Sequence, residues 1–306
     1  MNKVENTNVV SPRNCHLMLA SQLAYAIQKK TFDSTAERLI KAVGFKDTPK
    51  IFVGGLEEIN AALVGTNSDG VILAFRGTVP PGIINLQSWV DWINDIFMKK
   101  LITVEGITGK VHEGFWNSLA SIWEPILVEV KKQMNAQNPP LPLFITGHSK
   151  GGPLASFAAI RFKLEADINP EVVTFASPHP GDIPFSEFYN SKISSNTRYE
   201  FGNDIVPHLP AKKAFLEHLS KTPLPGKLLQ EAADWNYGPV GTLQFIKWDK
   251  KTIVGDSPEL EAERFLKLTE AILKLRFKEI AADHRHRCDG GYMTGVCPGV
   301  PCPDET

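Results

Sequence analysis

Blocks of apolar residues separated by turn residues recur along the chain and predict alternating strands and helices. The runs that predict strands are 61–64, 71–75, 141–146, 172–176 and 197–201. The Asn-Ser-Asp-Gly sequence at 67–70 is typical of a hairpin turn between the first two, and a helix is expected from about 152 to 166. This alternation predicts an α/β fold, with helices on both faces of a parallel or mixed sheet.

The last third of the chain predicts a second hairpin and a long helix. Residues 241–254 alternate in polarity around Asp249-Lys250, and Ser257-Pro258-Glu259 then has the features of a helix start. Four apolar residues follow at helical spacing, Phe265, Leu268, Ile272 and Leu275. This stripe favours packing against the core over a helix that lies on a membrane.

The composition and charge of the chain argue against several classes of protein. The 306 residues include 33 Lys+Arg and 34 Asp+Glu, so a net charge of -1 offers no electrostatic basis for binding nucleic acid or an anionic membrane. No apolar run reaches the roughly 20 residues of a membrane span, and Ser21 and Gln22 interrupt the apolar stretch 17–27, which predicts a helix face. Residues 1–9 are polar and lack the pattern of a secretory signal. We therefore expect one domain over 1–306 in a soluble, cytoplasmic protein, with a mature secreted form as the alternative.

The four cysteines leave three interpretations open. Cys15 stands alone, whereas Cys288, Cys297 and Cys302 gather near the end of the chain, beside His284 and His286. Free thiols are favoured, followed by a local disulfide. A zinc site is disfavoured because the spacing matches no common C-x-x-C pair, so no metal and no cofactor are expected.

A candidate nucleophile lies between the predicted strand at 141–146 and the helix that follows it. Gly147-His148-Ser149-Lys150-Gly151 fits G-x-S-x-G, and strand, tight turn and helix are the setting of a nucleophile elbow. Such a turn requires small neighbours, and the helix start places partial positive charge near the serine oxygen. Ser149 is therefore the predicted nucleophile.

A serine nucleophile needs a histidine base and a carboxylate that orients it, in the chain order Ser, acid, His for this type of fold. Asp204 follows the predicted strand at 197–201 directly, whereas its rival Asp182 lies further from a strand end. His16, His112, His148 and His179 precede Asp204, His208 lies only four residues after it, and His218 falls in an inserted stretch. His284 and His286 remain as candidate bases.

Six motifs in the right order resemble the fungal-type triacylglycerol lipase family, lipase class 3, between about residues 61 and 292. They are Phe75-Arg76-Gly77-Thr78, the segment 89–95, Val111-His112-Glu113-Gly114-Phe115, residues 147–152, Thr174-Phe175-Ala176-Ser177-Pro178 and Asn203-Asp204-Ile205-Val206-Pro207. The resemblance implies an α/β-hydrolase with a mostly parallel central sheet, which cuts carboxylic esters of lipids without a metal or cofactor.

Carried over by position, the resemblance assigns Ser149 as nucleophile, Asp204 as acid, and Thr78 and the Lys150 N–H as the oxyanion hole. The family shows a His and then a Tyr near the end, so Asp283-His284 followed by Tyr292 favours His284 over His286 as the base. The family's lid corresponds to 80–89. The long interval from Asp204 to His284 implies an insertion at about 210–237. Lys150 departs from the usual Leu, but only its backbone N–H is required.

The predicted function is hydrolysis of acylglycerol esters through an acyl-enzyme on Ser149, at a lipid–water interface if the lid opens. A phospholipase, a feruloyl esterase or a plain esterase of the same fold is the alternative, because the family includes these activities. A catalytically silent lipid-binding protein is the alternative from another class.

Overall fold

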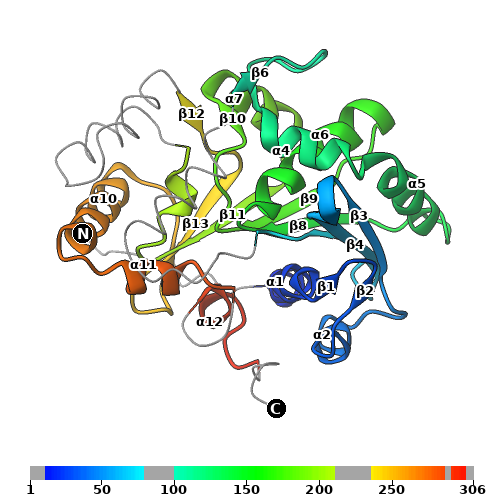
Figure 1. The fold of residues 1–306 in the computed structure, drawn as a ribbon, viewed down its shortest axis with the longest axis horizontal. Helices are drawn as coiled ribbons and strands as arrows, with labels where there is room; N and C mark the ends of the chain where they lie inside the picture. Colours follow the sequence, from blue (N-terminus) through cyan, green and yellow to red (C-terminus); the bar gives the residue numbers. More distant parts are fainter. Residues whose placement is uncertain (1–10, 79–99, 211–235, 287–290, 301–306) are drawn as a thin grey trace.

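An eight-stranded sheet forms the centre of the computed structural model, which describes residues 11–78, 100–210, 236–286 and 291–300. The strand order is β14-β13-β11-β9-β8-β5-β4-β3 (Figure 1). The five strands from β5 to β13 are parallel, while β3, β4 and β14 pair antiparallel at the edges. Strand bounds are β3 Lys50–Gly54, β4 Asn60–Thr66, β5 Val71–Phe75, β8 Leu143–His148, β9 Glu171–Phe175, β11 Asn196–Phe201, β13 Thr242–Ile246 and β14 Ile253–Val254.

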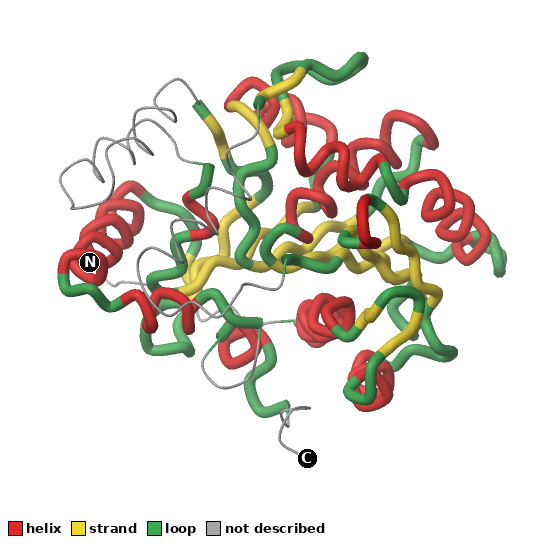
Figure 2. The backbone as a smooth tube through the Cα atoms, in the orientation of Figure 1, coloured by secondary structure: helices red, strands yellow, loops and turns green. Residues whose placement is uncertain are grey.

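Helices cover both faces of this sheet (Figures 1 and 2). One apolar core joins the sheet to α4, α5, α6, α7, α10 and α11, and a second core joins it to α1, α2 and α12. Helix bounds are α1 Pro12–Tyr25, α2 Ala36–Val43, α4 Glu113–Ala120, α5 Trp123–Met134, α6 Gly151–Ala166, α7 Ile183–Lys192, α10 Pro258–Leu273, α11 Phe277–Asp283 and α12 Tyr292–Val296. The predicted α/β architecture is confirmed.

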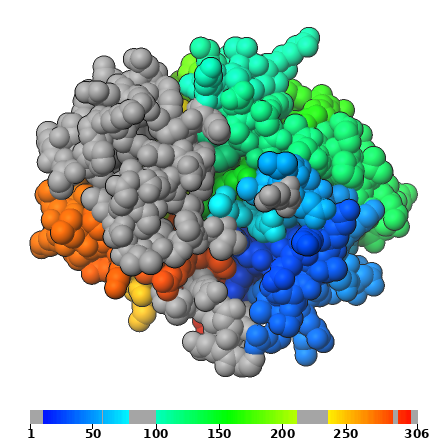
Figure 3. Space-filling view, in the orientation of Figure 1, coloured from blue at the N-terminus to red at the C-terminus, as the bar shows by residue number. Residues whose placement is uncertain are grey.

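The remaining elements are short. They are β1 Ile27–Gln28 and β2 Thr31–Phe32, which pair with each other; the four-stranded sheet of β12 Tyr237–Gly238, β10 Gly181–Asp182, β7 Val111–His112 and β6 Leu101–Ile102; and the 3₁₀ helices η1 Leu56–Glu58 and η2 Val206–His208. In the space-filling view, the atoms of α10 (orange) and those of the region of α1 and α2 (blue) lie on opposite sides of the visible face (Figure 3). Within the described part of the chain, no helix combines the length and apolarity needed to cross a membrane.

Strands β5 and β8 begin with apolar residues and are buried because both of their faces are covered. Every residue of β5 and β8 is buried, as parallel strands between two helical layers require. All five predicted strands, the hairpin between β4 and β5, and the hairpin between β13 and β14 are found where the sequence placed them.

One residue of the predicted apolar stripe on α10 needs correction, and the other predicted helix is more deeply buried than a single packed face requires. Leu268 and Ile272 of α10 are buried as expected, but Leu275 lies beyond the end of that helix, has a positive φ and is 64% exposed. The helix predicted for the stretch 17–27 is present as α1, which is buried over most of its length, Ser21 and Gln22 included. The Ser21 hydroxyl bonds Leu17 O and Thr146 Oγ1, which satisfies it inside the core.

A disulfide joins α1 to the end of α12, and the prediction of free thiols is wrong for its two cysteines. Cys15 and Cys297 have Cα atoms 5.0 Å apart although they lie 282 residues apart in the sequence. The local disulfide that we considered within the C-terminal cluster does not include Cys297. Cys288 and Cys302 lie outside the described residues.

Replacing both Cys15 and Cys297 by serine is expected to lower the free energy of unfolding by roughly 2–5 kcal/mol, because the crosslink restricts the unfolded chain. Denaturation by guanidinium chloride measures this loss, and the double variant should no longer respond to dithiothreitol. Equal midpoints for the oxidised wild type and the double variant would contradict a stabilising crosslink.

Candidate active site

The turn that carries Ser149 is held in a shape that ordinary side chains would obstruct. Ser149 follows β8 directly and has φ 56°, in the left-handed region that non-glycine residues adopt at a cost of about 1–3 kcal/mol. A Cβ on Gly147 would lie 2.2 Å from Gly151 O, and a Cβ on Gly151 would lie 2.3 Å from Phe75 O. Both glycines of G-x-S-x-G are therefore required by close backbone packing between β8, α6 and β5.

Three side chains from distant segments form a continuous hydrogen-bonded line. Ser149 Oγ lies 3.0 Å from His284 Nε2, and His284 Nδ1 lies 3.0 Å from both carboxylate oxygens of Asp204. All three residues are buried. Ser149 and Asp204 follow β8 and β11 at the same edge of the sheet, where the carboxyl ends of parallel strands meet. His284 ends α11, which returns to this edge.

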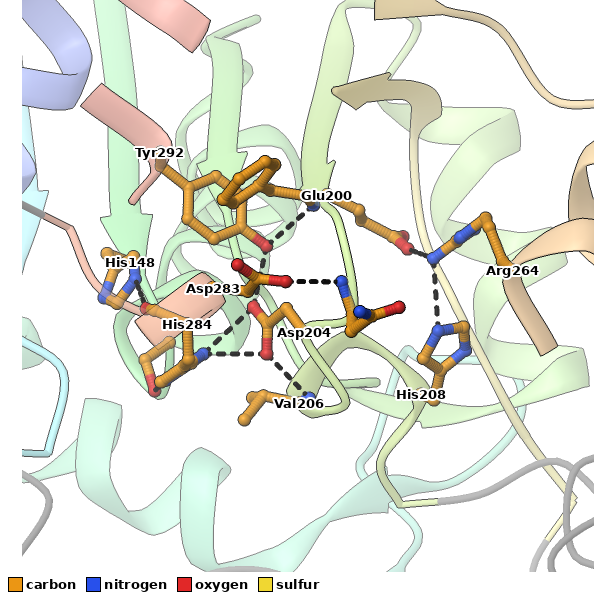
Figure 4. Close-up of polar contacts among 12 residues, drawn as sticks. His148, Glu200, Asp204, Val206, His208, Arg264, Asp283, His284 and Tyr292 are labelled. Carbon is orange, nitrogen blue, oxygen red and sulfur yellow. Dashed lines mark hydrogen bonds and ion pairs between the residues drawn. The ribbon is translucent and has the colours of Figure 1, made fainter. Parts of the chain in front are cut away.

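The Asp204 carboxylate is fixed by two further donors (Figure 4). The Tyr292 hydroxyl donates to Oδ2 at 2.7 Å, and the Val206 N–H donates to Oδ1 at 3.0 Å. Burial, together with the Asp204 charge, raises the pKa of Tyr292 well above its usual range, so this hydroxyl keeps its proton. Asp204 is thereby oriented toward His284 as an acceptor.

The rival candidates have other partners. Asp182 caps the N-terminus of α7, where its Oδ1 accepts from Phe185 N–H at 2.9 Å. His286 stacks on Tyr25, with ring centroids 4.3 Å apart. His208 lies 3.3 Å from Arg264 Nη2, and His218 lies outside the described residues. The geometry therefore brings together the three residues that the sequence selected, Ser149, Asp204 and His284.

The two predicted oxyanion-hole residues lie on adjacent strand ends. Phe75 of β5 is in register with Gly147 of β8, so Thr78 and Lys150 follow neighbouring strands at the same edge. The Lys150 side chain points away to Asn60, where Nζ donates to Oδ1 at 2.8 Å. Burial, reinforced by the nearby Arg76 charge, lowers the pKa of Lys150 to about 8.

Further charged groups lie next to the segments that carry Asp204 and His284 (Figure 4). The Asp283 carboxylate accepts from Asn203 N–H at 2.8 Å, which joins the residues that precede His284 and Asp204. Burial raises the pKa of Asp283 to about 6, although that hydrogen bond opposes the shift. Glu200 of β11 pairs with Arg198 and Arg264; burial alone would raise the pKa of Glu200, but the arginine charges lower it to about 2.

Several predictions fall outside this geometry. The expected lid at 80–89 and nearly all of the insertion at 210–237 lie outside the described residues. The disulfide removes Cys297 as a zinc ligand, and within the described ranges no group of three or more His, Cys, Asp or Glu side chains could hold a metal ion. Sequence reasoning missed Tyr25, whose hydroxyl lies 2.9 Å from His148 Nδ1, because nothing in its local pattern separates it from an ordinary helix residue.

Comparison with known proteins identifies the central segment. A family model for lipase (class 3) matches residues 72–214. A secreted mono- and diacylglycerol lipase A from Penicillium cyclopium is 29% identical over 155 residues, which cover 51% of this chain and 47% of that protein. A secreted mono- and diacylglycerol lipase 1 from Fusarium solani is 32% identical over 144 residues, covering 46% and 39%. The chain thus spans less than half the length of these curated relatives.

Solved structures extend the likeness over most of the chain. A lipase from Rhizopus microsporus var. chinensis covers 90% of this chain and 92% of its own, with a TM-score of 0.60 and 18% identity. A Rhizomucor miehei lipase in complex with its propeptide covers 80% and 71%, with a TM-score of 0.55 and 20% identity. These likenesses show the fold of an α/β-hydrolase, and the model of the class 3 lipase family matches residues 72–214, which the sequence motifs had indicated.

Proposed function

We propose that the protein is a serine hydrolase that cleaves the carboxylic esters of acylglycerols through an acyl-enzyme on Ser149. The observation that carries this proposal is the buried line from Ser149 Oγ through His284 to Asp204. The match of residues 72–214 to the class 3 lipases and the names of the fungal relatives support the choice of acylglycerols.

In the first half-reaction, His284 Nε2 accepts the Ser149 proton as the oxygen attacks the ester carbonyl. Asp204 stabilises the imidazolium and keeps the other ring proton on Nδ1, while Tyr292 and Val206 keep the carboxylate in place. The imidazolium then gives its proton to the departing alcohol. Water then enters, gives a proton to His284 and attacks the acyl carbonyl. The bond between the acyl carbon and Ser149 Oγ breaks, Oγ takes the proton back from His284, and the carboxylic acid leaves.

The oxyanion of each tetrahedral intermediate would be held by Thr78 and by the backbone N–H of Lys150. A single donor of this kind contributes about 3 kcal/mol to the stability of the transition state. Because the Lys150 ammonium bonds Asn60, its charge is directed away from the elbow rather than toward the substrate. This arrangement supports the view that a lysine can replace the family's leucine here.

The substrate range includes esters of other headgroups as alternatives. Phospholipids, feruloyl esters and soluble short-chain esters would require the same triad, and the pocket shape would select among them. Hydrolysis of emulsified triolein compared with p-nitrophenyl butyrate distinguishes a lipase from a plain esterase. A silent lipid-binding protein would not need the intact hydrogen-bonded line, which is why we favour an enzyme. The lid at 80–89, the insertion at 210–237 and the single domain over 1–306 remain part of the proposal.

We also propose that the protein works in an oxidising compartment. The Cys15–Cys297 disulfide supports this location, since such bonds are rare in reducing cytosol, and two relatives are described as secreted. The cytoplasmic location expected from the polar N-terminus finds no support in these observations.

Ser149→Ala and His284→Ala are each expected to lower kcat for p-nitrophenyl butyrate by roughly a thousandfold or more, because the members of a triad act as a unit. His286→Ala should lose less than about tenfold, since its ring packs on Tyr25. Asp182→Asn is the matched control for Asp204→Asn, and should keep most of the activity that Asp204→Asn loses. A rate for Ser149→Ala equal to that of the wild type would refute the acyl-enzyme.

Lys150 makes the free energy of unfolding depend on pH. Its pKa falls from an ordinary 10.5 to about 8 on folding, so above pH 8 the unfolded chain still binds a proton that the native state has released. Stability therefore rises with pH through this interval.

Relative to Lys150→Met, the wild type should gain on the order of 2 kcal/mol in its free energy of unfolding between pH 7.5 and pH 10. Urea denaturation at both pH values measures the difference, and taking it between two variants cancels the titration of other groups. Parallel pH profiles for the two proteins would show that the Lys150 ammonium is not desolvated.

A further inference from the structure

His148, which precedes the nucleophile, bonds the backbone of the base (Figure 4). Its Nε2 lies 2.8 Å from the carbonyl oxygen of His284, and its Nδ1 lies 2.9 Å from the Tyr25 hydroxyl. A carbonyl oxygen only accepts, so Nε2 carries the proton. In the neutral ring, Nδ1 then accepts from the Tyr25 O–H. His148 is only 2% exposed, so neither bond competes with water.

Tyr25 connects the same pair to the oxyanion turn. It is the last residue of α1, and a Cβ added to Gly77 would lie 2.0 Å from its hydroxyl oxygen and 2.6 Å from His148 O. The other side of the Tyr25 ring stacks on His286, with the two planes 8° apart. One phenol therefore touches the elbow, the turn before Thr78 and the segment that carries the base.

The surroundings of His148 keep its ring neutral. Burial, followed by the neighbouring His284 and His286, lowers the pKa of His148 well below its usual range, against the opposing effect of the bond to His284 O. The Tyr25 hydroxyl keeps its proton, because burial raises the pKa of Tyr25 despite the nearby Arg76 charge. Tyr292 also lies edge-on to the His148 ring, at 5.7 Å between centroids.

We propose that His148, held by Tyr25, is a positioning residue that fixes the backbone of His284 and so aims the base at Ser149 Oγ. This inference rests on the proposed function. Both nitrogens of His148 are occupied by His284 O and Tyr25, so the ring transfers no proton in the reaction. Misplacing a catalytic group by about 1 Å can cost roughly a hundredfold in rate, so the loss of the bond between His148 and His284 O should have a measurable effect on kcat.

The test compares variants that keep or remove the Nε2–H donor. His148→Leu removes the donor and should lower kcat for p-nitrophenyl butyrate by roughly 10- to 100-fold, with KM within about threefold. His148→Gln places an amide N–H near the same position and should recover kcat to within about tenfold of the wild type. Tyr25→Phe should produce a smaller loss in kcat than His148→Leu. His16→Leu is the control, because His16 lies on α1 like Tyr25 but bonds Asp69, in the turn that precedes β5.

Nitrogen NMR of histidine-labelled protein gives a readout that does not depend on activity. The resonances absent from His148→Gln identify His148, which should be the Nε2–H tautomer and should not titrate between pH 5 and pH 8. Tyr25→Phe should shift its Nδ1 resonance. If the wild type hydrolyses no ester, the proposed function is refuted. The spectrum still shows whether His148 bonds His284 O and the Tyr25 hydroxyl as a neutral ring.

Three results would overturn the positioning role: equal kcat for His148→Leu and the wild type, equal losses for His148→Leu and His148→Gln in folded protein, or a His148 ring that titrates in this range. Thermal unfolding of each variant establishes that it is folded. If His148→Leu does not fold, then His148→Gln, Tyr25→Phe and the wild-type spectrum still decide between the outcomes.

Discussion

The proposed roles of Ser149, His284 and Asp204 depend on the tight turn at Ser149. Parallel strands β5, β8 and β9 hold this turn at their carboxyl edge, and its backbone approaches its neighbours so closely that Gly147 and Gly151 have no room for a Cβ. The left-handed φ of Ser149 is tolerated because strand register and α6 determine it from both sides. The surrounding backbone therefore fixes Ser149 in this strained conformation. His284 and Asp204 come to it from other segments of the chain.

The two ends of the described chain converge on this edge through contacts outside the triad. From α1, Tyr25 bonds His148, while Tyr292 at the start of α12 bonds Asp204. The Cys15–Cys297 disulfide joins these two helices, and both pack against the same face of the sheet (Figure 1). Tyr25 and Tyr292, which hold His148 and Asp204, therefore lie on two helices that a disulfide joins on one face of the sheet. Helices α10 and α11 pack in the core on the opposite face.

Local features were predictable from the sequence, and long-range pairing was not. Strand β8, helix α6 and Ser149 follow from adjacent residues, and Asp204 follows from its place after a strand. Alternation in an extended segment cannot separate His284 from His286, because residues two apart point to the same side of such a segment. In the structure the segment is not extended, since His284 is the C-cap residue of α11. The chain folds there into a helix end, and this separates the two rings.

Pairings across the whole chain have no local signal. Cys15 and Cys297 meet because α1 and α12 cover the same face of the sheet. This tertiary arrangement cannot be deduced from the spacing of the cysteines in the sequence. Tyr25 reaches His148 for the same reason. Leu275 continues the apolar period of α10, which predicts a position in the core, but that helix ends at Leu273.

Peptide mapping after reaction with a fluorophosphonate would locate an activated serine, since the reagent reacts preferentially with a serine that an adjacent base activates. One adduct per chain is expected, located on Ser149, and it should be lost in His284→Ala. Unmodified protein, or an adduct on a different residue, would contradict the assignment of Ser149, His284 and Asp204 as the catalytic centre.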